Sequence, residues 1–121
     1  MSLNIRSLPS KFESVKEIIF EQEKYNVNIV LIAFQEIWKI PHPDLFNIKG
    51  FTFFHKQRQN TNSGGVGFFI KNNLSPTLNS DLTLFREKII ESLSLNITLN
   101  RQKIPVLNIY RPPNNNAETI S

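Results

Sequence analysis

Cysteine is absent from the 121 residues of this chain, which excludes a disulfide framework, a thiolate zinc site and a cysteine nucleophile. Long hydrophobic runs are absent as well. No segment approaches the length of a membrane span, and the first residues lack the apolar core of a secretory signal. We therefore expect an intracellular protein, nuclear or cytoplasmic, with no membrane partner.

Glycine and histidine are also scarce. Three of the four glycines, Gly64, Gly65 and Gly67, lie close together, but their spacing is not that of a Walker loop and no Gly-Lys-Ser/Thr follows. The spacing favours a turn followed by close strand packing. The histidines, His42 and His55, lack ligand spacing to each other, so we predict that both lie exposed in loops.

The residues that are present are typical of one modest globular domain. Apolar residues make up 40% of the chain and charged residues 20%, and ten phenylalanines indicate a real core. The formal net charge of +4 and the isoelectric point near 9.6 favour an anionic partner. The preference is slight, because the lysines and arginines are scattered rather than clustered.

The first part of the sequence predicts a strand, a helix and a second strand. Residues 10–13 have the spacing of a capping box, and apolar residues then recur at helical intervals, which predicts a helix from Lys11 to Lys24. The run from Asn28 to Phe34 is short, apolar and rich in β-branched residues, as in a strand covered on both faces. With a strand end in residues 1–6, this makes a β–α–β unit whose strands pair in parallel.

The remainder predicts a succession of strands. Apolar residues occupy every second position from Leu93 to Leu99, which is the pattern of a half-buried strand, and the polar residues 100–102 supply a hairpin turn. The expected class is α+β in a single domain. Strands are expected at 51–54, 64–70, 92–99 and 104–110, with a loop at 72–81.

Glu36 is the first candidate for chemistry, because it follows an apolar strand directly and ligands collect at the carboxyl ends of such strands. Taken alone, Glu36 is more often a surface acid, and Asn4 a turn or cap residue. If the first two strands pair, however, both emerge at the same sheet edge. A carboxamide beside a carboxylate suits a hard divalent cation and a phosphate oxygen.

Other candidates each have a structural alternative. Tyr110 closes the last predicted strand, where its hydroxyl would donate to a phosphoryl oxygen or its ring would simply cap the core. Lys56, Arg58 and Lys71 would contact a nucleic-acid backbone or face water. Trp38 is expected to pack across the loop beside the candidate site.

Four segments, taken together, resemble a known family. Their order and spacing are similar to those of the endonuclease/exonuclease/phosphatase superfamily, specifically the endonuclease domain of LINE-type, non-LTR retrotransposons. The resemblance covers essentially the whole chain, and no single segment decides it. The segments are Asn4-Ile5-Arg6-Ser7-Leu8, Phe34-Gln35-Glu36-Ile37-Trp38, Gly64-Gly65-Val66-Gly67-Phe68-Phe69-Ile70-Lys71 and Asn108-Ile109-Tyr110-Arg111-Pro112-Pro113.

This resemblance implies a sandwich of two β-sheets flanked by helices, and Mg²⁺-dependent hydrolysis that nicks a DNA target, with Mn²⁺ as the alternative ion. Glu36 would bind the metal, Asn4 would hold the metal's surroundings or the phosphate, and Tyr110 would hydrogen-bond the scissile phosphate. The cation would polarise the phosphoryl oxygen. Glu91 matches a glutamate that opens the next strand in such domains. The residues expected at the nucleic acid are Arg6, Arg58, Lys71 and Arg111.

The family's Gly-Asp-Phe-Asn and Ser-Asp-His segments do not occur in this sequence. We therefore expect residues 1–113 to be the N-terminal part of such a domain, truncated and inactive alone, and 114–121 to be a polar tail. The expected partners are DNA, the missing half of the domain, or a reverse transcriptase of the parent polyprotein.

Without that half, we expect the apolar side of residues 92–99 to be exposed and prone to association. Alternatives to the endonuclease are a non-catalytic remnant or a nucleic-acid-binding or interaction module. Within the superfamily, an inositol-phosphate phosphatase is a further alternative.

Overall fold

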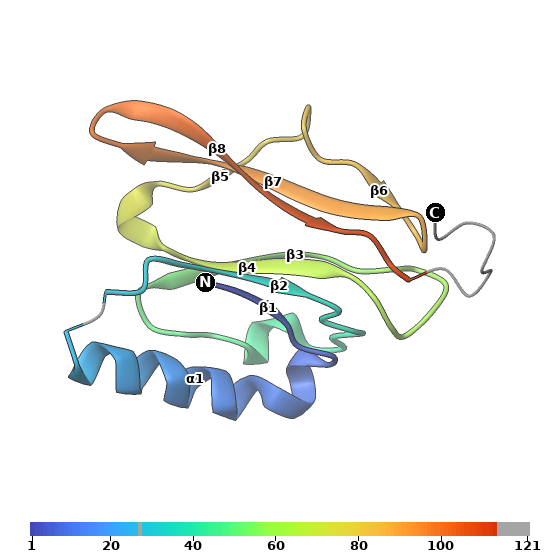
Figure 1. The fold of residues 1–121 in the computed structure, drawn as a ribbon, viewed down its shortest axis with the longest axis horizontal. Helices are drawn as coiled ribbons and strands as arrows, with labels where there is room; N and C mark the ends of the chain where they lie inside the picture. Colours follow the sequence, from blue (N-terminus) through green and yellow to red (C-terminus); the bar gives the residue numbers. More distant parts are fainter. Residues whose placement is uncertain (27, 114–121) are drawn as a thin grey trace.

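A computed structural model of the protein describes residues 1–26 and 28–113 and confirms the α+β class. In this part of the chain, one α-helix and two β-sheets lie in layers, with α1 (Leu8–Lys24) on one side of the first sheet and the second sheet on the other (Figure 1). The polar tail predicted for residues 114–121 lies outside the described residues.

The first sheet has the strand order β1-β2-β4-β3. Its first two strands pair in parallel, as predicted, with Asn4 opposite Gln35, and its other pairs are antiparallel. Relative to the sequence pattern, β1 and β2 are shorter, β3 is longer and β4 begins two residues later. They are β1 (Ser2–Asn4), β2 (Leu31–Gln35), β3 (Phe51–Lys56) and β4 (Val66–Lys71).

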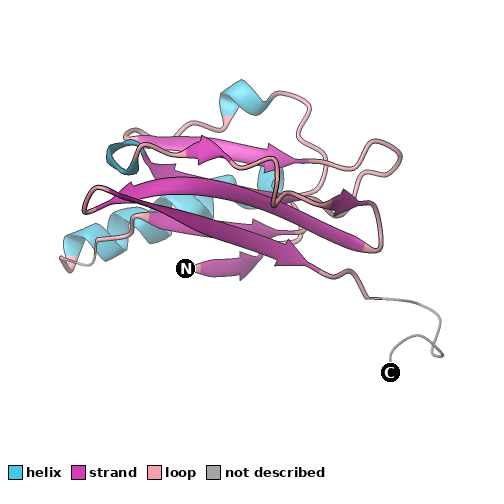
Figure 2. Ribbon diagram, turned by 90° about the horizontal axis from the view of Figure 1, so that it is seen from above, coloured by secondary structure: helices cyan, strands magenta, loops and turns pink. Residues whose placement is uncertain are grey.

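The second sheet is built around the predicted hairpin. Strand β7 (Ile90–Leu99) pairs with β8 (Gln102–Tyr110) through a tight turn at Asn100 and Arg101, which both have positive φ, as such turns require. Seen from the side of this sheet, the hairpin lies over the first sheet with α1 behind it (Figure 2). Short elements complete the fold: β5 (Thr77–Leu78), β6 (Phe85–Arg86), and the 3₁₀ turns η1 (Pro43–Leu45) and η2 (Asn72–Leu74).

Helix α1 begins three residues earlier than the capping-box spacing predicts. Ser7 is the N-cap, and its hydroxyl accepts a hydrogen bond of 3.4 Å from the Ser10 amide. Pro9 stands in the first turn, where its missing N–H costs no intrahelical bond. A hydroxyl and a proline therefore start the helix upstream of the predicted Ser10.

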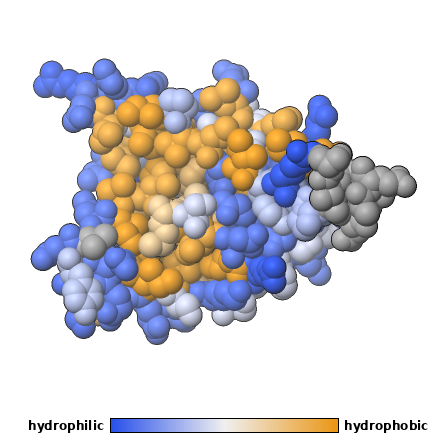
Figure 3. All heavy atoms as spheres, in the orientation of Figure 1, coloured by the Kyte–Doolittle hydropathy of each residue, from blue (hydrophilic) through white to orange (hydrophobic). Residues whose placement is uncertain are grey.

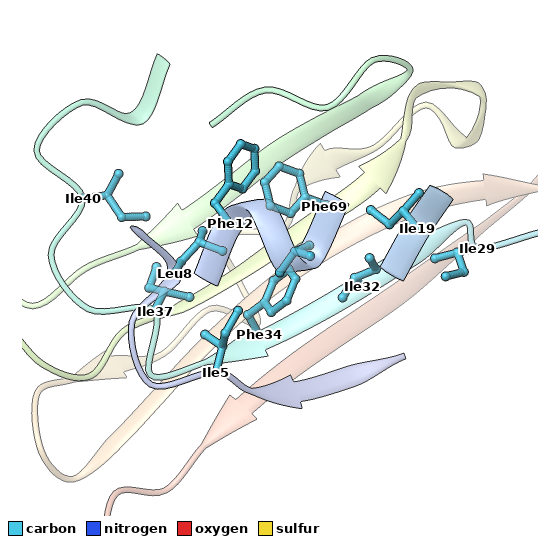
Figure 4. Packing of buried hydrophobic residues seen from close by; sticks show 11 residues of the cluster. Ile5, Leu8, Phe12, Ile19, Ile29, Ile32, Phe34, Ile37, Ile40 and Phe69 are labelled. Atoms are coloured by element: carbon cyan, nitrogen blue, oxygen red, sulfur yellow. The ribbon is translucent and has the colours of Figure 1, made fainter. Parts of the chain in front are cut away.

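The core between α1 and the first sheet combines aliphatic side chains, mostly isoleucines, with phenylalanine rings (Figure 4). The Phe69 ring stacks on Phe53 and on Phe12 of the helix, with ring centroids 4.6 Å and 6.0 Å apart. It meets Phe34 edge to face, with a centroid distance of 5.9 Å. Burying one such side chain stabilises the fold by about 1.5–3 kcal/mol. The helix contributes its apolar stripe: Leu8, Phe12, Val15 and Ile19.

A second core lies between the sheets and corrects one prediction. Leu93 and Leu95, expected on an exposed face, are 2% and 0% exposed, because the far side of the first sheet covers them. The exposed apolar residues of the hairpin are Leu107 and Ile109 on its opposite face, together with Leu99 at the end of the predicted face. In the orientation of Figure 1, apolar residues also gather across the middle of the visible surface (Figure 3).

The prediction for one histidine is wrong as well. His55 lies in strand β3 rather than in a loop, and its half-buried ring stacks on Phe53 at 4.7 Å. Loss of hydration there lowers the pKa of His55. Trp38, expected to pack across the loop beside the site, is 39% exposed and lines a concavity with Pro9 and Asn62. His42 is exposed as predicted.

Candidate active site

Three loops meet at one end of the first sheet and hold each other by backbone hydrogen bonds. Bonds of 2.9–3.0 Å join residues 5–8 to residues 35–37, and bonds of 2.7–3.4 Å join residues 37–39 to residues 62–65. Left-handed backbone conformations cluster in these loops, at Arg6, Ser7, Glu36, Trp38 and the first two clustered glycines. Residues of this kind persist only where their surroundings enforce them, and they concentrate at functional sites.

Backbone geometry at Glu36 decides where its carboxylate points. Along β2, Phe34 faces the helix, while Ala33 and Gln35 face the second sheet, so a regular strand would send the next side chain toward the helix. The chain leaves the extended conformation at Glu36, where φ is +55°. The side chain therefore turns toward β8 of the second sheet.

Tyr110 meets this carboxylate from the end of β8. Its hydroxyl donates a hydrogen bond of 2.6 Å to Glu36 Oε1, across 74 residues of sequence. Burial, and then the hydrogen bond and negative charge of Glu36, raise the pKa of Tyr110 well above its ordinary value. The hydroxyl is consequently a fixed donor. On the other side of the carboxylate, Arg6 Nε lies 3.8 Å from Glu36 Oε2, with the Arg6 side chain 75% exposed.

A buried ion pair lies directly beneath. Glu91, opposite Tyr110 in the β7–β8 register, is fully buried and accepts a hydrogen bond of 2.5 Å from Arg58 Nε. Its oxygens also accept the amide protons of Gly65 at 2.7 Å and Lys88 at 3.0 Å. The Glu91 carboxylate of the second sheet thus holds the loop at Gly65 of the first sheet, and Arg58 pairs with the charge of Glu91.

The glycine in front of this pair has no room for a side chain. A Cβ on Gly64 would stand 2.1 Å from Arg58 Nε, and its φ of +74° is in the left-handed region. The predicted turn and close packing at the clustered glycines are both present.

These groups surround an open concavity of about 460 Å³, the site hollow. Lys88 supplies positive charge beside the Glu36 carboxylate, whereas the charge of Arg58 is paired with Glu91, and the proline pair after Tyr110 forms a wall. A hollow with donors and cations around one carboxylate suits an anionic group and a cation together. Its lining residues are Glu36, Arg58, Ser63, Lys88, Tyr110, Pro112 and Pro113.

Asn4 comes to the same sheet end but does not line this hollow. It is exposed, pairs in register with Gln35, and borders a smaller concavity beside α1 with Lys11 and Ser14. Within the described residues, no hydrogen bond joins the Asn4 side chain to Glu36. The structure therefore brings Glu36 and Tyr110 into contact and places Asn4 outside the site hollow.

The predicted nucleic-acid contacts lie in different surroundings. Arg6 and Arg111 are exposed next to Glu36 and Tyr110, respectively. Arg58 is nearly buried, with its side chain 7% exposed and held by Glu91 and Ser63. Lys71 lies at the far end of β4, where its Nζ donates to Asn28 Oδ1 at 2.7 Å and stands over the Phe51 ring.

Asn108 is the residue that sequence reasoning overlooked. Its side-chain amide is 2% exposed and donates to the backbone oxygens of Phe34 and Gly67, both at 2.9 Å, while its oxygen accepts from Gln35 Nε2 at 2.7 Å. It therefore fastens β8 to the centre of the first sheet. The available signal was its place two residues before Tyr110, on the same inward face of an alternating strand.

A magnesium ion fits this donor set in a limited way. The described residues contain no group of three or more His, Asp or Glu side chains placed to hold a metal. Mg²⁺, however, is often held by one or two carboxylates, its own waters and the oxygens of a bound phosphate. Among the described residues, exposed Arg6 is the ionic partner of Glu36 Oε2, at 3.8 Å, and the Glu36 side chain is 21% exposed and so accessible to an ion.

In comparisons with known proteins, no protein-family model matches the chain, and no curated protein matches it. In the described part of the chain, no helix has the length and apolar character needed to cross a membrane.

Proposed function

We propose that this chain carries the metal- and phosphate-binding side of a Mg²⁺-dependent DNA endonuclease. The observation that carries the proposal is the contact between Tyr110 and Glu36. It brings a carboxylate and a fixed hydroxyl donor together at the mouth of two packed sheets. Among the lining residues, Lys88 adds positive charge for a phosphodiester.

Each group has a chemical task in this proposal. Glu36 would hold the metal through Oε2, the oxygen that Tyr110 does not contact, and the ion would supply polarisation of the phosphoryl oxygen. When a phosphate binds, the single hydroxyl proton of Tyr110 would turn from Glu36 Oε1 to a non-bridging phosphate oxygen, and its raised pKa keeps that proton in place at any working pH. Arg6 neutralises Glu36 in the free protein and is exposed enough to move to a DNA phosphate.

The arrangement of layers supports a two-sheet sandwich of the endonuclease/exonuclease/phosphatase type. The hairpin packs on the face of the first sheet that α1 leaves free, and the four resembling segments all reach the same end. The proposal extends to nicking by a retrotransposon-type enzyme in contact with DNA. Since the Gly-Asp-Phe-Asn and Ser-Asp-His segments do not occur in this sequence, the 121 residues alone bind these groups without completing hydrolysis.

The metal half of the proposal is tested by titrating Mg²⁺ into ¹⁵N-labelled protein and following amide chemical shifts. We expect shifts confined to the surroundings of residues 36, 110 and 4, and selective broadening of the same signals by Mn²⁺. Glu36→Gln keeps the shape and removes the charge, so it abolishes the response. Glu17→Gln, an exposed glutamate on α1, serves as the matched control and leaves it intact.

An equal response in Glu36→Gln, or none in the wild type, contradicts a metal site at Glu36. Catalysis is examined separately by nicking of supercoiled plasmid in Mg²⁺. We expect no nicking by the isolated chain. Cutting by wild type and not by Glu36→Ala would show that these residues suffice for hydrolysis.

A nucleic-acid-binding module without catalysis is the second candidate. It is favoured by the single carboxylate of the site hollow, which Arg6 and Tyr110 already satisfy. DNA binding that depends steeply on salt, survives Glu36→Ala and ignores Mg²⁺ would identify this alternative.

A further inference from the structure

A second concavity of about 540 Å³ adjoins the site hollow. This tryptophan hollow is lined by Ser7, Pro9, Trp38, Lys39, Pro41 and Asn62. The same two segments line both concavities, because Trp38 follows Glu36 by two residues and Asn62 directly precedes Ser63. A chain of nucleotides that places a phosphate at Glu36 therefore passes beside this hollow.

Trp38 is held rigidly with its side chain in the open. Its amide donates to Gly64 O at 2.8 Å, and the amide of Lys39 donates to Asn62 O at 2.7 Å. Its φ of +65° is costly for a bulky residue, on the order of 1–3 kcal/mol, and its side chain is 39% exposed. The fold thus maintains a strained backbone that presents the indole to solvent instead of burying it.

Charge separates this hollow from the other concavity with an exposed aromatic residue. Phe20 on α1 is 63% exposed, but three glutamates and one lysine share its concavity, which leaves a net negative charge there: Glu13, Glu17, Glu21 and Lys16. Lys39 is the charged residue among those that line the tryptophan hollow. Phosphates are repelled from the first surface and attracted to the second.

We propose that the Trp38 indole is a stacking platform for an unpaired DNA base next to the phosphate at Glu36. Lys39 binds the adjoining backbone phosphate, and the hydroxyl of Ser7 and the amide of Asn62 contact the edge of the base. Stacking on an aromatic side chain is worth about 1–3 kcal/mol per base and tolerates every base, since each has a π-face. The position of the phosphate rests on the proposed function, whereas base stacking itself requires no metal.

Trp38 is the sole tryptophan, so intrinsic fluorescence reports this position directly. Wild-type protein is titrated in EDTA with a short oligothymidylate and with an abasic oligomer of equal length and charge. We expect saturable quenching by oligothymidylate and much weaker quenching by the abasic oligomer. Equal quenching by both would show attraction by charge alone and overturn the proposal, as would its absence with oligothymidylate.

Variants extend the test to affinity, measured by anisotropy of a labelled oligothymidylate. We expect Trp38→Ala to weaken binding about tenfold, Trp38→Phe to retain most of it, and Phe20→Ala to match the wild type. Circular-dichroism melts check that the variants are folded. Unchanged binding by folded Trp38→Ala contradicts stacking.

The two proposals fail in different ways. If Mg²⁺ shifts are absent while oligothymidylate still quenches Trp38, the metal site is wrong and the stacking platform stands. If the Glu36-dependent Mg²⁺ response is present without quenching, the reverse holds.

Discussion

Burial and the Glu36 carboxylate act in the same direction on the Tyr110 hydroxyl, because both disfavour the phenolate. The side chain is 9% exposed, yet its oxygen reaches a carboxylate at the rim. A donor that stays protonated differs from a general base in its pH dependence. Any loss of function with rising pH must then come from another group, up to the high pH at which Tyr110 itself ionises.

The first prediction concerns this ionisation. In a Tyr25→Phe background Tyr110 is the sole tyrosine, and we expect tyrosinate absorbance to develop only well above pH ~10, its ordinary pKa. Above that pH the unfolded chain releases a proton that the folded chain retains, so the free energy of unfolding decreases. Chemical denaturation at several pH values measures it.

Tyr110→Phe is the control, because it removes the ionisable group. Its free energy of unfolding should lack the decrease that begins near pH ~10. Removing a hydrogen bond to a charged partner also costs about 1.5–3 kcal/mol at neutral pH. A tyrosinate signal at the ordinary pKa in folded protein would contradict the buried contact.

The second prediction concerns the Arg58–Glu91 pair. Glu91→Ala leaves the Arg58 guanidinium buried without a partner and frees the amides of Gly65 and Lys88, so we expect a loss of about 3–5 kcal/mol in unfolding free energy. Urea denaturation measures the loss. Glu13→Ala, which removes an exposed pair with Lys16, should change stability by less than about 1 kcal/mol. Equal effects would show that burial has no influence on the pair.

At the scale of elements, the site depends on loops more than on strands. The loop at residues 62–65 receives hydrogen bonds from residues 37–39 and donates one to Glu91. Its position therefore depends on both sheets. A substitution at Gly64 should disturb this loop, since Arg58 fills the space in which a side chain would stand.

The third prediction compares two glycines. Gly50 and Gly64 both have positive φ, but a Cβ at Gly50 meets nothing within 4 Å. We expect Gly50→Ala to cost about 1–2 kcal/mol through backbone strain alone. Gly64→Ala adds displacement of Arg58 from its pair and should cost at least about 3 kcal/mol. Thermal unfolding of both variants measures the difference, and equal losses would contradict close packing at Gly64.

Periodicity alone predicted most elements, because α1, β2, β4 and the β7–β8 hairpin have strong apolar patterns. It failed where local chemistry decides. The helix start moved to Ser7 because a hydroxyl and Pro9 compete better than the capping-box spacing at Ser10. The buried side of β7 was misjudged because alternation identifies an apolar face but not the surface that covers it.

Site residues followed the same division. Glu36 was found because it ends an apolar strand, and parallel pairing of β1 and β2 places Asn4 near it. Its contact with Tyr110 depends on a single left-handed residue, which no hydrophobic pattern records. The burial of Arg58 and the role of Asn108 depend on how two sheets pack, and this information lies in no short segment.

At the scale of the whole molecule, the second sheet has an open face. Leu107 and Ile109 are 47% and 51% exposed on adjacent outward positions of β8, which pairs only with β7 among the described strands. Exposed apolar residues beside an unpaired strand edge promote association. Self-association therefore remains our prediction, but through this outer face instead of the buried one.

The fourth prediction tests that face. We expect the double variant Leu107→Thr/Ile109→Thr to bind less hydrophobic dye and to elute closer to a monomer than the wild type. Size-exclusion chromatography with light scattering gives the mass. Leu45→Thr, an exposed leucine on η1, is the matched control and should change neither property. A wild type that is already monomeric without dye binding would contradict the prediction.

The hydrogen bond from Tyr110 to Glu36 also joins the two sheets, since one residue follows the first sheet and the other ends β8. A ligand that needs both groups is bound only while the sheets are docked. By mass action, the ligand then stabilises the form with docked sheets. At a ligand concentration about one hundred times Kd, the free energy of that form is lowered by about 2.7 kcal/mol. The same ligand would slow amide hydrogen exchange along β8 as far as its start at Gln102, remote from the ligand at Tyr110, because separation of the sheets and release of the ligand become one event.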